Sequence, residues 1–111
     1  MIEQLNNMVE SENQKQFEAA TKNGVTIVDF FATWCAPCRM MGMILEEINE
    51  EHPDFNIVKI DVDTNETLAR KFGVMSIPTI VIMKDGKQAE KHVGLMQKED
   101  LVDLVDSYLQ F

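Results

Sequence analysis

The fold is decided by residues 25–38, which read Val25-Thr26-Ile27-Val28-Asp29-Phe30-Phe31-Ala32-Thr33-Trp34-Cys35-Ala36-Pro37-Cys38. The first half, Val25 to Phe31, is a continuous run of β-branched and aromatic residues broken by one acid, Asp29. Such a run is typical of a strand that is buried on both faces, at the centre of a mostly parallel sheet. Pro37 suits the first turn of a helix, so the sequence predicts a helix that starts near Cys35.

Extended and helical patterns alternate on both sides of this stretch. Met8-Val9 predicts a short edge strand, and the capping-box pattern Ser-x-x-Gln at residues 11–14 predicts a helix that ends at Asn23-Gly24. The helix from Cys35 carries an apolar stripe with helical spacing, and His52-Pro53 ends it. Phe55 to Asp61 is the next predicted strand, which makes a parallel strand–helix–strand crossover.

The second half of the chain predicts two strands between two helices. A short helix over residues 66–72 ends at Gly73, and Asp85-Gly86 marks a hairpin between strands at 78–83 and 88–93. The last helix carries Leu101, Leu104, Val105 and Tyr108 on one stripe. This order, βαβ followed by ββα, predicts an α/β fold with one mixed sheet and helices on both faces. At 111 residues, we expect a single domain over residues 1–111.

Composition excludes several classes of function. The formal net charge of −9 argues against nucleic acid or an anionic membrane as a partner, because both attract cationic surfaces. The first residues lack the features of a secretory signal, and no apolar run approaches the roughly 20 residues of a membrane helix. Two cysteines do not make a secreted disulfide framework. We therefore expect a cytoplasmic protein.

The two cysteines, three residues apart, indicate redox chemistry. A disulfide between them closes so short a loop that it constrains the unfolded chain by only about 2 kcal/mol. At a helix start, backbone N–H groups and the helix dipole stabilise a thiolate, so Cys35 is the candidate nucleophile and the more buried Cys38 the resolving thiol. The alternatives are two core cysteines or half of a zinc site. Zinc would need two more ligands, and we interpret His52 and His92 as surface residues, so we expect no metal.

Asp29 is the second candidate for chemistry. An ionised carboxylate is costly inside an apolar strand, so we expect a raised pKa and a carboxyl group that tends to hold its proton. Such a group near Cys38 can take the proton of that thiol and later return it. The alternative is a polar residue kept for structural reasons. Lys59, on the neighbouring strand, is a candidate partner for Asp29 or else a lysine that reaches solvent.

Three further features have weaker interpretations. Ser76-Ile77-Pro78-Thr79 predicts a turn before a strand, where a cis proline is permitted. Asp61 and Asp63 are too few carboxylates to predict a metal site. Six methionines are expected mostly to fill the core: Met40, Met41, Met43, Met75, Met83 and Met96. Those near the cysteines and the proline loop are also suited to an adaptable apolar contact face.

From Ser11 to Leu109 the chain resembles the thioredoxin family. The resemblance rests on motifs that occur in the family's order: Val28-Asp29-Phe30, Trp34-Cys35-Ala36-Pro37-Cys38, Val58-Lys59-Ile60 with Asp63, Ser76-Ile77-Pro78-Thr79, Lys84-Asp85-Gly86 and Val93-Gly94. It implies the thioredoxin fold, a central sheet flanked by four helices. It also implies that Cys35 is the nucleophile, Cys38 the resolving thiol, and Asp29 the buried proton acceptor with Lys59 beside it.

The resemblance extends to the surface that binds clients. Pro78 matches the family's cis-proline, which faces the disulfide and shapes the substrate groove. The matching substrate-binding residues are Trp34, Ala36, Pro37, Ile77, Pro78, Val93 and Gly94. Four positions depart from the family's usual residues: Ala36 replaces glycine, Phe31 replaces tryptophan, Met43 replaces proline and Arg39 replaces lysine. The two residues between the cysteines help to set the redox potential of the pair. The change from glycine to Ala36 therefore affects how strong a reductant the protein is.

These features together predict a general protein-disulfide reductase that acts through a mixed disulfide. We expect no bound cofactor, since the Cys35–Cys38 pair is itself the redox centre. The expected partners are a flavoprotein thioredoxin reductase and client proteins with disulfides, and we expect a monomer. Two other functions remain open: a more oxidising disulfide oxidase or isomerase, and a binding module that clamps a partner protein.

Overall fold

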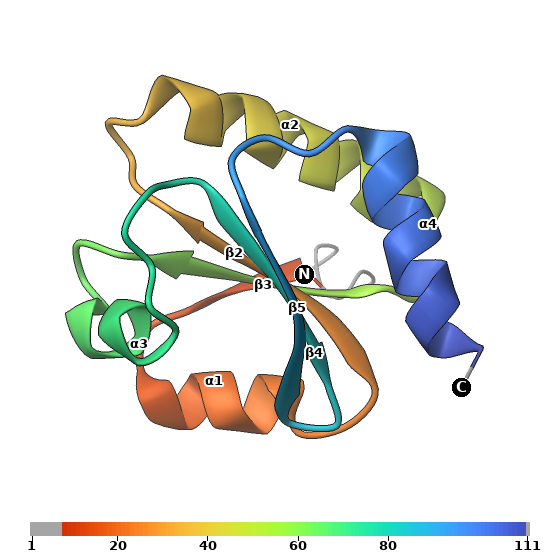
Figure 1. The fold of residues 1–111 in the computed structure, drawn as a ribbon, viewed down its shortest axis with the longest axis horizontal. Helices are drawn as coiled ribbons and strands as arrows, with labels where there is room; N and C mark the ends of the chain where they lie inside the picture. The colour runs from red at the N-terminus through yellow and green to blue at the C-terminus, as the bar shows by residue number, and fades with distance from the viewer. Residues whose placement is uncertain (1–7, 111) are drawn as a thin grey trace, which may run out of the picture.

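The computed structural model describes residues 8–110, which form a five-stranded mixed sheet between two layers of helices (Figure 1). The strand order is β1-β3-β2-β4-β5. β1 and β2 run parallel to β3, whereas β4 runs antiparallel to β2 and β5 antiparallel to β4. The strands are β1 (Met8–Ser11), β2 (Val25–Phe31), β3 (Asn56–Asp61), β4 (Thr79–Lys84) and β5 (Lys87–Val93). The predicted mixed sheet, with β1 at its edge, is confirmed.

Helices cover both faces of the sheet, as the sequence predicts. In Figure 1, α1 (Gln14–Thr21) and α3 (Glu66–Lys71) lie on one side, and α2 (Ala36–Glu51) and α4 (Lys98–Leu109) lie on the other. The alternation along β2 explains the two layers, because successive side chains of a strand point to opposite faces. Ile27 packs in a cluster with residues of α2 and α4, and Val28 packs in a cluster with residues of α1 and α3.

The central strand β2 positions the cysteines. Its residues are buried except Phe31, which is half-buried, because β3 and β4 flank the strand and helices cover both of its faces. The chain leaves β2 at Phe31 and enters α2 at Ala36. This places Cys35 and Cys38 at the carboxyl end of the most buried strand, where open α/β sheets commonly hold their functional sites.

The cap of α1 differs from the predicted one. Ser11 is the last residue of β1 and is paired with Ile60, and its hydroxyl donates a hydrogen bond of 3.0 Å to the Asn13 carbonyl in place of accepting one from the helix. Asn13 is the N-cap instead, and its side chain accepts a hydrogen bond of 2.9 Å from Gln16 N. The Gln16 side chain accepts one of 2.8 Å from Glu12 N. The predicted capping box at residues 11–14 is therefore wrong, and the capping residue lies two positions later.

The other boundaries lie close to the predicted ones. β3 begins at Asn56 and β4 at Thr79, each one residue later than predicted. Pro78 has no N–H to donate to a sheet ladder, which explains the later start of β4. The predicted hairpin is confirmed: Asp85 (φ 50°) and Gly86 (φ 84°) both adopt the left-handed conformation that tight hairpins need. Within residues 8–110, no helix is long and apolar enough to cross a membrane.

Candidate active site

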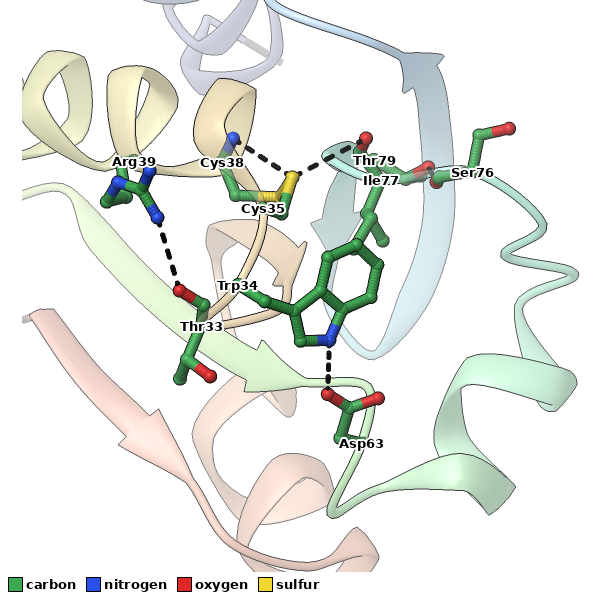
Figure 2. The surroundings of a disulfide bond; sticks show 9 residues. All are labelled: Thr33, Trp34, Cys35, Cys38, Arg39, Asp63, Ser76, Ile77 and Thr79. Atoms are coloured by element: carbon green, nitrogen blue, oxygen red, sulfur yellow. Dashed lines mark hydrogen bonds between the residues drawn. A yellow bond between two sulfur atoms is a disulfide. The ribbon is translucent and has the colours of Figure 1, made fainter.

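Cys35 and Cys38 form a disulfide at the N-terminus of α2 (Figure 2). Cys35 is the N-cap residue, in an extended conformation, and Pro37 occupies the first turn. The backbone N–H of Cys38 donates a hydrogen bond of 3.2 Å to Cys35 Sγ. A sulfur at this position meets a free backbone donor and the positive end of the helix dipole, both of which lower the pKa of a thiol.

Exposure alone does not distinguish the two cysteines in this oxidised state. Cys35 is 5% exposed and Cys38 is 4% exposed, so the expected greater burial of Cys38 is marginal. They differ in what they face. Cys35 Sγ lies 3.9 Å from the Ile77 carbonyl oxygen, whereas Cys38 lines a groove of about 310 Å³ on α2. The sulfur of the disulfide has no hydrogen, so a hydrogen bond to the Ile77 carbonyl becomes possible only after reduction.

The loop that faces Cys35 is built around a cis peptide bond between Ile77 and Pro78. The Thr79 hydroxyl donates a hydrogen bond of 2.6 Å to the Ser76 carbonyl, which closes the turn predicted at residues 76–79. The Gly94 N–H donates one of 2.8 Å to the Pro78 carbonyl. Residues 93 and 94 therefore lie beside the proline loop, as the resemblance implies. Pro78 is buried, Ile77 and Gly94 are half-buried, and Val93 is exposed.

Trp34 extends from the loop before α2 and is 68% exposed. Its indole N–H donates a hydrogen bond of 2.8 Å to Asp63 Oδ2 (Figure 2). Asp61 Oδ1 accepts a hydrogen bond of 2.9 Å from Asp63 N, so the two carboxylates belong to one turn. Trp34 and Ile77 line a small groove of about 190 Å³. Reasoning from residue spacing considered Asp63 only as a weak metal ligand and missed its contact with Trp34.

Because the resemblance implies that Trp34 binds client proteins, this contact predicts a role for Asp63 in client binding. In an Asp63→Ala variant the indole loses its acceptor and is free to rotate away from the groove. The hydrogen bond is exposed, so the free energy of unfolding should fall by only about 1 kcal/mol. The KM for a protein disulfide should rise several-fold while kcat changes little. Steady-state kinetics and Trp34 fluorescence test this, with Asp63→Asn as a control that keeps an acceptor oxygen. An unchanged KM in Asp63→Ala would contradict the prediction.

Asp29 is fully buried in the middle of β2. Neither carboxylate oxygen has a hydrogen-bond partner among residues 8–110. Burial raises the pKa of Asp29 from its usual value of 3.8 to about 7, although the positive charge of Lys59 opposes part of this rise. The expected increase in pKa is confirmed. A carboxyl group with this pKa changes its protonation state near neutral pH, as a group that exchanges protons during turnover must.

Lys59 lies on β3 directly opposite Asp29 in the parallel register. Its side chain is not fully solvated, because the residue is half-buried and lines the same groove as Cys38. Lys59 Nζ lies 4.7 Å from the centre of the Phe31 ring. The structure therefore places the predicted pair Asp29 and Lys59 on adjacent strands, and the Lys59 side chain reaches the groove where Cys38 lies.

Three methionines lie on the surface and do not fill the core. Met41 and Met83 are buried, as predicted, but the exposed fractions are 51% for Met40, 60% for Met43 and 94% for Met75. Core filling is wrong for these three residues. Met43 lines the groove beside Cys38, and Met75 lines the groove beside Trp34. They fit the other interpretation, an apolar face near the disulfide.

The two histidines make local contacts away from the cysteines. His52 caps α2 and stacks on Phe55, with ring centres 4.5 Å apart. A ring nitrogen of His92 lies 3.2 Å from the Leu95 carbonyl oxygen. In the part of the chain that the structure describes, no three His, Cys, Asp or Glu side chains are grouped in a way that could hold a metal ion. The cysteines therefore have no further ligands within residues 8–110 with which to form a zinc site.

Comparison with known proteins gives consistent matches. A family model described as Thioredoxin matches residues 8–107. The thioredoxin of Bacillus subtilis is 49% identical over 96 residues, which cover 86% of this chain and 92% of that protein. The thioredoxin of Listeria monocytogenes is 46% identical over 92% of this chain and all of its own length. A solved structure of a mutant thioredoxin from Halobacterium salinarum superposes with a TM-score of 0.89 at 37% identity, covering 96% of this chain and 95% of that one.

Proposed function

Because this chain belongs to the thioredoxin family and is a protein-disulfide reductase, we propose how its residues divide the reaction. The Cys35 thiolate attacks one sulfur of a client disulfide, the client S–S bond breaks, and one client thiolate leaves. Cys38 then loses its proton and attacks the Cys35 sulfur. The second client thiolate leaves, so two electrons have passed to the client and the chain holds the Cys35–Cys38 disulfide.

The observation that carries this assignment is the position of Cys35 as N-cap of α2. Its sulfur accepts a hydrogen bond from Cys38 N and faces the Ile77 loop, where a client can approach. Cys38 lies within the helix and lines the groove beside α2. A nucleophile needs thiolate character, and the N-cap position with its backbone N–H donor favours Cys35 in this respect.

In the second step, Asp29 accepts the proton of Cys38. The support is its burial, its pKa near neutrality and its place opposite Lys59, whose side chain reaches the groove beside Cys38. An ionised Asp29 is a base in surroundings of low dielectric, where water is a poor proton acceptor. Lys59 keeps part of the population of Asp29 ionised near pH 7.

Clients dock on the apolar rim of the disulfide. Its exposed members are Trp34, Ala36, Pro37 and Val93, and the proline loop forms the far wall. The backbone of a client can lie along this loop, and the rim excludes water from the reacting sulfurs. The full docking set is Trp34, Ala36, Pro37, Ile77, Pro78, Val93 and Gly94.

The oxidised chain needs a reductase to return it to the dithiol, as the family requires generally. We assign this step to a flavoprotein thioredoxin reductase that draws on NADPH. The chain acts as an electron carrier without a bound cofactor, as a single domain over residues 1–111, and as a monomer. Both of its cysteines belong to the redox pair, which suits the reducing conditions of the cytoplasm.

The reduction potential of the Cys35–Cys38 couple tests the direction of electron flow. Equilibration with glutathione followed by thiol trapping should give a potential well below that of the glutathione pool, as a reductant requires. Ala36→Gly, which restores the family's usual residue, is the matched control. Its reduction potential should also lie below that of the glutathione pool. A potential near or above the glutathione pool would contradict the prediction and favour disulfide formation or isomerisation.

A further inference from the structure

The Lys59 ammonium has a defined place between a ring and a helix. Its Nζ lies 4.7 Å from the centre of the Phe31 ring, and a Cβ added at Gly42 of α2 would lie only 3.6 Å from it. Phe31, Gly42 and Lys59 all line the groove that contains Cys38. The ring and the helix backbone therefore confine the ammonium to this groove.

The register of the sheet explains why the ring and the ammonium meet. Phe31 follows Asp29 by two residues on β2, so both side chains point to the same face. Lys59 is the register partner of Asp29 on β3, which makes Phe31 its diagonal neighbour, within reach of a long side chain. On the other side of Asp29, β4 presents Ile80, which carries no charge. The negative face of an aromatic ring attracts an ammonium, most strongly where water is partly excluded.

Several charged groups lie near Lys59, and the carboxylates among them could attract its ammonium. On β1 its register partner is Glu10, and Asp61 follows two residues later on β3. From α2, Glu46 and Arg39 line the same groove. None of the carboxylates in residues 8–110 forms an ion pair with Lys59, whereas the Phe31 ring contacts it directly. The aromatic contact, and not a competing carboxylate, thus fixes the ammonium on the side of Asp29.

We propose that Phe31 is a positioning residue for the resolving step: the face of its ring holds the Lys59 ammonium in the groove beside Cys38, next to the buried Asp29. This inference rests on the proposed role of Asp29 as proton acceptor. Without the ring, the lysine side chain is free to swing toward Glu10, Glu46 or solvent. Asp29 then loses part of the attraction to Lys59 that opposes the rise of its pKa through burial, and it ionises at a higher pH.

The experiment compares Phe31→Leu, which keeps an apolar side chain but removes the ring, with Phe31→Trp, which keeps an aromatic face. In the oxidised protein, the Asp29 carboxyl is titrated directly by infrared or NMR spectroscopy. In Phe31→Leu we expect the Asp29 midpoint to rise by roughly half a pH unit or more, because the Lys59 ammonium then lies farther from the Asp29 carboxylate. In Phe31→Trp we expect the midpoint to stay near that of the unmodified chain. An unchanged midpoint in Phe31→Leu would overturn the inference.

The same Phe31→Leu substitution is also made in a chain that carries Lys59→Met. This comparison shows whether the ring acts on Asp29 through Lys59 or by disturbing the fold. In a Lys59→Met chain, Phe31→Leu should leave the Asp29 midpoint where Lys59→Met alone puts it, because no ammonium remains to be held. A further rise in that background would overturn the inference, since the ring would then act without Lys59. The pH profile of turnover is read alongside. If the Asp29 midpoint moves in Phe31→Leu but the turnover profile does not, the contact between the ring and Lys59 stands, whereas the proton-acceptor role of Asp29 fails and the role of Phe31 in the resolving step is overturned with it.

Discussion

Cys38→Ser is expected to stop the reaction after its first step and to leave client proteins covalently joined to Cys35. The serine hydroxyl cannot displace the client sulfur, so the mixed disulfide persists. Turnover should fall on the order of 10³-fold or more, since losing one member of a two-group nucleophilic unit disables the whole cycle. The hydrogen bond from residue 38 to Cys35 Sγ comes from the backbone, so the substitution leaves the thiolate at Cys35 supported.

The matched control is Cys35→Ser, which removes the sulfur that faces the Ile77 loop and keeps the one that faces the groove. It should lose turnover equally but capture no clients. The two variants are incubated with a protein disulfide, quenched in acid and compared by non-reducing electrophoresis and mass spectrometry. Equal capture by both would defeat the assignment of Cys35 as nucleophile and Cys38 as resolving thiol.

Asp29→Asn is expected to make the protein more stable and the enzyme slower. The carboxyl has a pKa of about 7 in the folded chain and an ordinary value of 3.8, so the folded state binds the proton more tightly than the unfolded state does. Stability is then lost as pH rises through the interval between these values, and the full loss applies above about pH 7. At pH 8 the loss is about 4 kcal/mol, from the size of this shift. Asparagine is similar in shape and carries no charge, so it removes this loss.

The two effects of Asp29→Asn have different pH dependences, which denaturant titration and kinetics can separate. The gain in free energy of unfolding should be near zero at pH 4, grow toward pH 7 and then level off. Turnover should fall by on the order of 10²-fold at and above neutral pH, where an ionised Asp29 would otherwise accept the proton of Cys38. A variant that is more stable but unchanged in rate would refute the proton-acceptor role. A variant with no added stability at pH 8 would refute the raised pKa.

Much of the fold could be predicted because local patterns and tertiary packing agree. The run from Val25 to Phe31 is apolar enough to belong only at the centre of a sheet, and the structure places it there with the predicted bounds. The Asp85-Gly86 turn was equally clear, because few residue pairs adopt two left-handed conformations in succession. The cap of α1 was wrong because the serine of the capping pattern is held in β1, which a local motif does not reveal.

Only part of the candidate site could be predicted, because some of its contacts form between residues that are far apart in the chain. Helix-start cysteines and an acid in an apolar strand can be recognised from the sequence, since their chemistry depends on neighbours along the chain. The contacts of Trp34 with Asp63 and of Lys59 with Phe31 depend on loops and strands that meet only in the folded chain. The exposed methionines show the same limit: Met75 lies in the loop between α3 and β4, and residue type alone does not say whether a methionine there or on α2 is buried.

The sequence by itself determined the order of strands and helices, the redox pair Cys35 and Cys38, and the acid Asp29 in an apolar strand. These features follow from side-chain chemistry and from spacing along one segment. The tertiary structure decided which sulfur faces the Ile77 loop and which aromatic ring lies against Lys59. Such relations are set by strand register and by the packing of α2 on the sheet, which bring together residues far apart in the chain.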